Sequence, residues 1–161
     1  MRLGPSARQG GHHEAKKSAS IQKVVSCLVN YGAELSVDME YYYFLKDNQH
    51  IEIEAARIFN DDDFEADFVI SMGGDGTFLK AASRVGKKGI PILGVNMGRL
   101  GFLADVSPSD IEKCMDAIYQ ENYAIENRAL IQVTTDGEPL EGYNCALNDV
   151  AILKRDTASM I

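Results

Sequence analysis

The sequence predicts an α/β domain with a parallel sheet, followed by the first strands of an incomplete β-rich domain. Two apolar runs, 67–72 and 90–95, each end in a glycine-rich loop, and helix-forming residues separate them. Two apolar strands joined by a helix form a βαβ unit, whose parallel sheet is buried on both faces. After Asn122 the pattern changes to consecutive strands, which predicts a domain boundary near 123–127.

The first third of the chain predicts one helix and two shorter elements. Residues 1–17 are polar and glycine-rich without periodicity, so we expect a disordered or atypical tail there. From Ser18 the apolar residues recur at helical spacing and predict a helix that ends before Gly32, a C′ glycine. A strand over 34–37 and a helix over 40–46 are expected to follow.

The middle of the chain holds the predicted βαβ unit and one further helix. Between the strands over 67–72 and 90–95, a helix is expected over 77–85. The next helix has a clear predicted start. Ser107 as N-cap, with Asp110 three residues later, is typical of a capping box.

The end of the chain predicts the start of a second domain. Residues 128–153 indicate a strand, a turn at Asp136–Gly137 and a longer strand that includes Asn148 and Asp149. The expected organisation is therefore a tail, an α/β domain and the start of a truncated β-rich domain, at 1–17, 18–124 and 125–161.

Composition limits the class of protein. The chain has 161 residues, 45% of them apolar and 25% charged, which is typical of a soluble globular protein with one core. It contains no apolar run long enough to span a membrane and no secretory signal. The net charge of −8 opposes binding to nucleic acid or anionic membranes. Three separated cysteines without a CxxC pair favour a reducing cytoplasm over disulfides or a zinc site.

The central chemical signal is the run GGDGT at 73–77, between a strand and a helix. Glycines let a phosphate approach backbone N–H groups, and the positive end of a helix attracts it. A carboxylate such as Asp75 beside a phosphate is explained if it acts through Mg²⁺ or accepts a proton from an attacking hydroxyl. A tight turn with a capping Asp is the alternative. The expected phosphate-binding loop consists of Gly73, Gly74, Gly76 and Thr77.

Two further clusters carry polar side chains. Residues 96–106 (NMGRLGFLADV) follow the second strand, and ligands of open α/β sheets bind outside the carboxyl ends of strands. Arg99 could donate hydrogen bonds to a phosphate group. Phe102 can either cover a flat ring or belong to the core. The pair Asn148–Asp149 interrupts an apolar run. It indicates either a bulge or edge position, or a pair suited to ribose hydroxyls and an adenine edge.

These three segments, in this order and spacing, resemble the bacterial NAD kinase family. GGDGT, NMGRLGFLADV and LND are similar to its GGDGT motif, its NxGxLGFL loop and its Asn-Glu/Asp motif. Diacylglycerol and sphingosine lipid kinases share GGDGT, and phosphofructokinases carry a close relative of it. The resemblance, which extends from about Ala15 to Ile161, implies a phosphofructokinase-like, nucleotide-binding α/β domain.

The resemblance also implies an activity: Mg²⁺-dependent transfer of a phosphoryl group from ATP to the 2′-hydroxyl of the adenosine ribose of NAD, giving NADP. Polyphosphate is the other possible donor. Asp75 is the implied proton acceptor, and no side chain is implied as a metal ligand. The intact enzyme is implied to be a cytoplasmic homo-oligomer without nucleic-acid or membrane partners. The implied dinucleotide contacts are Asp75, Gly76, Lys80, Phe102, Leu103, Asn148, Asp149 and Ser159.

The sequence departs from the family at both ends. Residues 1–14 lack the apolar strand that opens family members, and the chain stops at Ile161, before the TPTGSTAY-type motif that completes the dinucleotide site. Two alternatives therefore stand beside an active kinase: a catalytically inactive dinucleotide-binding fragment, and a GGDGT-type lipid kinase. The acidic net charge and the Asn148–Asp149 pair speak against the lipid kinase.

Overall fold

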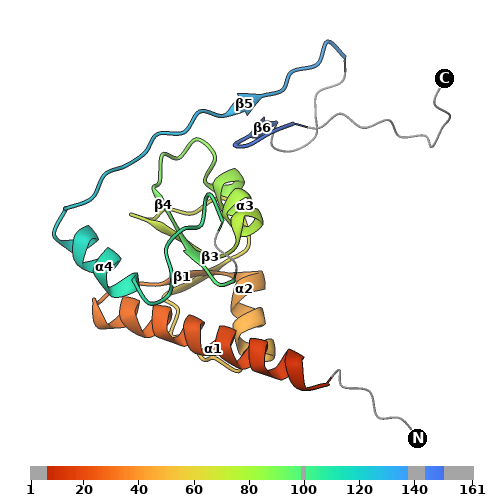
Figure 1. Cartoon of the computed structure of the whole chain (residues 1–161). Coiled ribbons are helices and arrows are strands. Elements are labelled where there is room, and N and C mark those ends of the chain that lie inside the picture. The colour runs from red at the N-terminus through yellow and green to blue at the C-terminus, as the bar shows by residue number, and fades with distance from the viewer. Residues whose placement is uncertain (1–6, 99–100, 138–143, 151–161) are drawn as a thin grey trace, which may run out of the picture. The chain divides into compact units, whose positions relative to one another are not determined.

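A computed structural model describes residues 7–98, 101–137 and 144–150, with side chains from Ala15 onward (Figure 1). The chain divides into two compact units, Met1–Ile125 and Glu126–Ile161. The first unit contains the helices and the parallel strands, and the second contains one antiparallel strand pair.

Helix α1 (Ala7–Asn30) is the longest element and lies along the base of the first unit (Figure 1). Of the apolar stripe that the spacing predicted, Ile21, Val24 and Leu28 are buried, whereas Val29 is 54% exposed. Gly32 follows the end of the helix with φ +72°. The expectation of a tail without structure is wrong for residues 7–17, which are helical. Adding turns to an already packed helix avoids the cost of nucleation, so residues without an apolar period can still extend it.

The next elements form a small parallel sheet. Its strands are β1 (Ser36–Asp38) and β2 (Arg57–Phe59). Helix α2 (Met39–Tyr43) leaves β1 directly and continues as a π-helical turn, Phe44–Asn48. Asp38 caps α2, because its carboxylate accepts the backbone N–H of Tyr41 at 2.9 Å. The helix expected over 40–46 is therefore present, whereas β2 was not expected.

The predicted βαβ unit is confirmed. Strands β3 (Val69–Gly73) and β4 (Ile92–Asn96) pair in parallel, and helix α3 (Asp75–Val85) connects them. On the far side of β4, Val106 forms a parallel bridge to Val95. The described residues thus form an α/β structure with small parallel sheets rather than one continuous sheet.

Helix α4 (Ile111–Tyr119) begins later than predicted, and its capping differs. Asp110 rather than Ser107 occupies the N-cap position. The Ser107 hydroxyl donates to the Asp110 carboxylate at 2.8 Å and accepts the N–H of Ser109, so these residues form a turn before the helix. The expected capping box is therefore wrong, because Ser and Asp side chains here bond to each other and not across the first helical turn.

Helix α1 contributes to two apolar clusters of the first unit. One joins α1 to β4 and α4, and α4 is further tied to α1 by the Tyr31 hydroxyl, which donates to Asp116 at 2.6 Å. The other joins α1 to the turn after α2 and to Ile51. The buried members of the first cluster are Val24, Cys27, Leu28, Val95, Ile111 and Met115.

The second unit contains β5 (Ile131–Gln132) and β6 (Cys145–Ala146), which pair antiparallel, with a bend at 136–137. The expectation that Asn148 and Asp149 lie within a strand is wrong, because β6 ends at Ala146. The Asn148 amide donates to the Asp149 carboxylate at 3.1 Å, a local bond of the kind that competes with strand pairing. Among the described residues, no helix is both long and apolar enough to cross a membrane.

Candidate functional site

The GGDGT segment forms the junction between β3 and α3. Gly74 is the N-cap residue, and Asp75 is already the first residue of the helix, earlier than the start at Thr77 that the sequence indicated. The backbone N–H groups of Thr77 and Phe78 both bond to the Gly74 carbonyl. A carboxylate in the first turn interacts favourably with the positive end of the helix.

The Asp75 carboxylate binds three consecutive backbone N–H groups of the segment 101–104. Oδ2 accepts from Phe102 at 2.9 Å, and Oδ1 accepts from Leu103 at 3.0 Å and from Ala104 at 3.1 Å. These bonds, led by the one from Phe102, lower the pKa of Asp75 below its usual value. The side chain is therefore an ionised carboxylate at neutral pH.

Three glycines around this carboxylate are required by contacts inside the protein. A Cβ on Gly101 would lie 2.1 Å from Asp75 Oδ1, and a Cβ on Gly73 would lie 2.2 Å from the Thr77 hydroxyl. A Cβ on Gly94 would lie 2.8 Å from the Ala104 backbone. At Gly94 a larger residue would push β4 and the segment 101–104 apart, whereas at Gly73 and Gly101 the Thr77 and Asp75 side chains would have to move.

Two other glycines have no such internal reason. A Cβ on Gly74 or Gly76 would meet no described atom within 4 Å, and neither residue has a positive φ. Their missing side chains leave the backbone at the start of α3 open to the outside. Backbone left open in this way at a helix start is accessible to a group that approaches from solvent.

Asn96 holds the second glycine-rich segment together, and its neighbour Met97 connects that segment to the first. It is buried, its amide donates to the Ala104 carbonyl at 3.0 Å, and its Oδ1 accepts the N–H of Gly98 at 2.7 Å. The N–H of Met97 bonds to the Gly73 carbonyl at 3.1 Å. The loops after β3 and β4 are therefore held side by side at the carboxyl ends of these strands, as expected for neighbouring parallel strands.

The structure brings some of the predicted site residues together and leaves others apart. Asp75, Gly76, Phe102 and Leu103 adjoin one another, and the Phe102 ring is 95% exposed rather than in the core. Lys80 lies on α3 but pairs with Glu40 at 3.1 Å. Asn148 and Asp149 belong to the second unit, and Arg99 and Ser159 lie outside the described residues.

Sequence reasoning missed the roles of Gly94, Gly101 and Ala104 in this site. The glycines were visible in the sequence, but nothing local distinguishes a glycine required by packing from one that leaves a surface open. The distinction depends on which distant side chain lies above each Cα.

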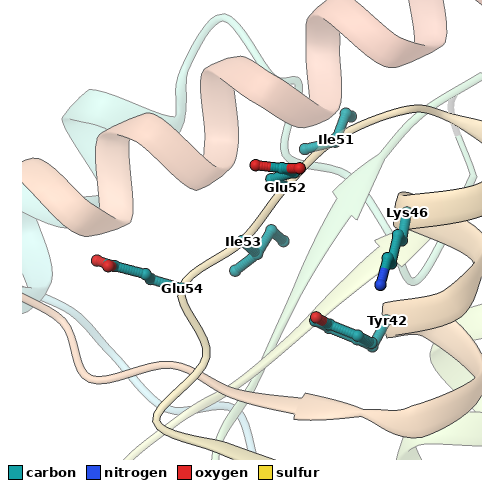
Figure 2. A pocket seen from close by; sticks show the side chains of 6 residues that line it. All are labelled: Tyr42, Lys46, Ile51, Glu52, Ile53 and Glu54. Carbon is teal, nitrogen blue, oxygen red and sulfur yellow. The ribbon is translucent and has the colours of Figure 1, made fainter.

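A pocket of about 450 Å³ lies elsewhere in the first unit, beside α2 and the segment 51–54 (Figure 2). None of the predicted site residues lines it. Its walls carry both charges and apolar groups: Tyr42, Lys46, Ile51, Glu52, Ile53 and Glu54. Across the described part of the chain, no group of three His, Cys, Asp or Glu side chains could hold a metal ion.

The fold and the site define an α/β protein with a glycine-rich strand-to-helix junction whose single carboxylate faces a second glycine-rich segment. The family model described as the ATP-NAD kinase N-terminal domain matches residues 8–123. The chain therefore belongs to the ATP-NAD kinase family.

Curated proteins of similar sequence are NAD kinases, in agreement with this family. An NAD kinase of Bacteroides fragilis is 49% identical, and one of Porphyromonas gingivalis is 38% identical, each over 94% of this chain and 52% of its own length. The chain thus spans about half the length of these curated relatives. A crystal structure of yeast NADH kinase complexed with NADH has a TM-score of 0.59 at 17% identity. The match covers 76% of this chain and 40% of that one, and it bears on the fold alone.

Proposed function

We propose that this chain contributes the first part of the active site of an NAD kinase, which transfers a phosphoryl group from ATP to the 2′-hydroxyl of NAD. The observation that carries the proposal is the ionised Asp75 carboxylate beside two glycines, Gly74 and Gly76, that face open space at a helix start. Such a helix start is suited to phosphate, and a carboxylate there is suited to a hydroxyl donor.

The reaction forms one bond and breaks one. The 2′-oxygen bonds to the γ-phosphorus, the bond from that phosphorus to the β,γ-bridging oxygen breaks, and the hydroxyl proton passes to Asp75. Phe102 and Leu103 hold the adenine by contact with its ring face. Asn148 and Asp149 hold the adenosine, and Lys80 and Ser159 add contacts to the dinucleotide. Catalysis rests mainly on positioning.

Mg²⁺ would enter with the nucleotide phosphates, because Mg²⁺ in such enzymes is bound through one or two carboxylates and the substrate's own phosphate oxygens. No group of three His, Cys, Asp or Glu side chains among the described residues could hold the ion, so the phosphates would supply most of its ligands, and bound Mg²⁺ would neutralise charge on the transferred group. We place the reaction in the cytoplasm, in keeping with three cysteines that are free thiols. The intact enzyme is proposed to be a homo-oligomer, as the family resemblance implies.

A second function, dinucleotide binding without phosphoryl transfer, is favoured by one observation. The three N–H bonds that lower the pKa of Asp75 also make it a weaker proton acceptor. A lipid acceptor is supported less well, since a net charge of −8 opposes attachment to anionic membranes.

The test is NADP formation from NAD, ATP and Mg²⁺, measured with the wild-type chain and with Asp75→Asn. General-base catalysis predicts a loss of turnover of about 10²–10⁴-fold in the variant. Asp105→Asn, which alters an exposed carboxylate just beyond the same segment, is the matched control. NAD binding without NADP formation by the wild type would favour the binding function, and near-normal turnover of Asp75→Asn would remove Asp75 from the chemistry.

A further inference from the structure

One side chain fixes the backbone of the segment that carries Phe102. The three N–H groups bound by Asp75 belong to consecutive residues, so the peptide planes from Phe102 to Ala104 are all oriented by one carboxylate. Bonds from N–H groups to an ionised acceptor are about twice as strong as bonds between neutral groups.

The exposed ring depends on this backbone orientation. With 95% of its surface exposed, the Phe102 side chain has almost no packing of its own to set its direction. The direction in which the ring leaves the backbone is therefore decided by the peptide planes on either side of it. Leu103, which is partly buried beside it, is placed by the same carboxylate.

The carboxylate keeps room for a ligand while it holds the segment. An ionised carboxylate offers about four acceptor sites, and three are occupied here, two on Oδ1 and one on Oδ2. The remaining site on Oδ2 can accept a hydroxyl without any of the three bonds being broken.

We propose that Asp75 is a positioning residue for the segment 101–104, and that it couples recognition of a ribose hydroxyl to the orientation of the Phe102 ring that stacks on the adenine. Gly101 is its required counterpart, because only glycine leaves space for the carboxylate. The ligand in this inference rests on the proposed function, whereas the anchoring of the segment does not.

Gly101→Ala is designed to break the three N–H bonds to Asp75 while the carboxylate keeps its charge. The new Cβ would lie 2.1 Å from Oδ1, and the carboxylate at the end of its short side chain can turn away while it remains ionised. Gly98→Ala is the matched control, because a Cβ at that position meets no atom of the described residues within 4 Å and its N–H bond to Asn96 is kept.

The first measurement is hydrogen exchange of the amides of Phe102, Leu103 and Ala104 in the full chain. Loss of bonds to a charged acceptor predicts exchange at least about tenfold faster in Gly101→Ala and Asp75→Asn, and unchanged exchange in Gly98→Ala. Unchanged exchange in Gly101→Ala, in a protein that melts like the wild type, would show that Asp75 does not hold the segment 101–104.

The second measurement is a double-mutant cycle on NAD binding with Gly101→Ala and Phe102→Ala. If the anchor acts through the ring, Phe102→Ala weakens binding in the wild type but adds little in the Gly101→Ala background. Additive effects would overturn the coupling. If the wild type does not bind NAD, the proposed function fails, and the coupling fails with it. The exchange rates would then decide the anchor independently.

Discussion

The two units of the chain differ in how their strands are supported. In the first unit, β3 and β4 are parallel, and parallel strands require a crossover, here α3, to connect them. In the second unit, β5 and β6 pair over two residues each, and Ile131 is 49% exposed. Each connection between parallel strands contains a helix, and that helix supplies apolar side chains to a core. A short antiparallel pair needs no such helix.

This difference indicates which unit contributes more to the free energy of unfolding. Among the residues that the structure describes, the fully buried side chains, including Ile21, Val24, Val95 and Ile111, all belong to the first unit. An isolated two-stranded ribbon is only marginally stable in water. We therefore expect substitutions in the first unit to destabilise the protein and equivalent substitutions in the second to have little effect.

The largest expected effect is that of Ile111→Ala. Ile111 is 0% exposed at the start of α4 and packs in the cluster that joins α4 to α1 and β4. Removing its buried carbons and leaving a cavity predicts a loss of about 2–5 kcal/mol. Urea unfolding followed by near-UV circular dichroism measures it, since the Tyr31 and Tyr119 rings lie 5.2 Å apart across the same two helices. A loss below about 1 kcal/mol would contradict the core assignment.

Two glycine substitutions compare the units directly. In Gly94→Ala the new Cβ would lie 2.8 Å from both the Ala104 Cα and the Phe78 ring, and overpacking of this kind predicts a loss of about 1–3 kcal/mol. In Gly137→Ala the Cβ meets no atom within 4 Å in the part of the chain that the structure describes, and the backbone has no positive φ. We expect that variant to be neutral or slightly more stable. Equal losses in the two melts would show that the units are equally packed.

Two arginines make the same comparison for ion pairs. Arg84 bonds to Asp62 Oδ1 and to the Asp61 carbonyl, each at 2.8 Å, and to the Asp38 carboxylate, with its side chain 23% exposed. Arg128 bonds to Glu126 at 2.8 Å in the second unit, where both side chains are exposed.

Arg84→Met is expected to cost about 1–2 kcal/mol, because a mostly buried guanidinium loses three bonds, one of them to the partly buried Asp38 carboxylate. Arg128→Met is expected to cost about 0–1 kcal/mol, as is usual for exposed pairs. Unfolding in low and high salt measures both. The expectation fails if Arg128→Met is the more destabilising of the two.

The first unit was also the more predictable from sequence. Strands β3 and β4 and helix α3 were expected because buried parallel strands are continuous apolar runs bounded by glycine. Strand β2 was missed because two of its three residues, Arg57 and Ile58, are exposed, so it shows no apolar alternation. The capping box at Ser107 was wrong because a sequence spacing cannot tell a helical turn from an isolated one.

The candidate site was predictable only in part. A carboxylate between glycines at a strand-to-helix junction indicated Asp75. Its three backbone partners lie 27, 28 and 29 positions away in the sequence, and no local pattern encodes that pairing. The partner of Lys80, Glu40, is likewise 40 positions away. Which glycine faces a carboxylate and which faces solvent follows from such long-range contacts alone.

The smallest expected effect is that of Ile131→Ala, which repeats the Ile111→Ala substitution in the second unit. Ile131 opens β5 and pairs with Ala146, but about half of its side chain remains in contact with solvent. Truncating an exposed side chain removes little buried area and leaves no closed cavity, so the expected change in the free energy of unfolding is within about 0.5 kcal/mol. The same urea titration measures it. A loss comparable to that of Ile111→Ala would mean that Ile131 is buried in the folded protein and that the second unit contributes to a core, which would remove the contrast between the two units.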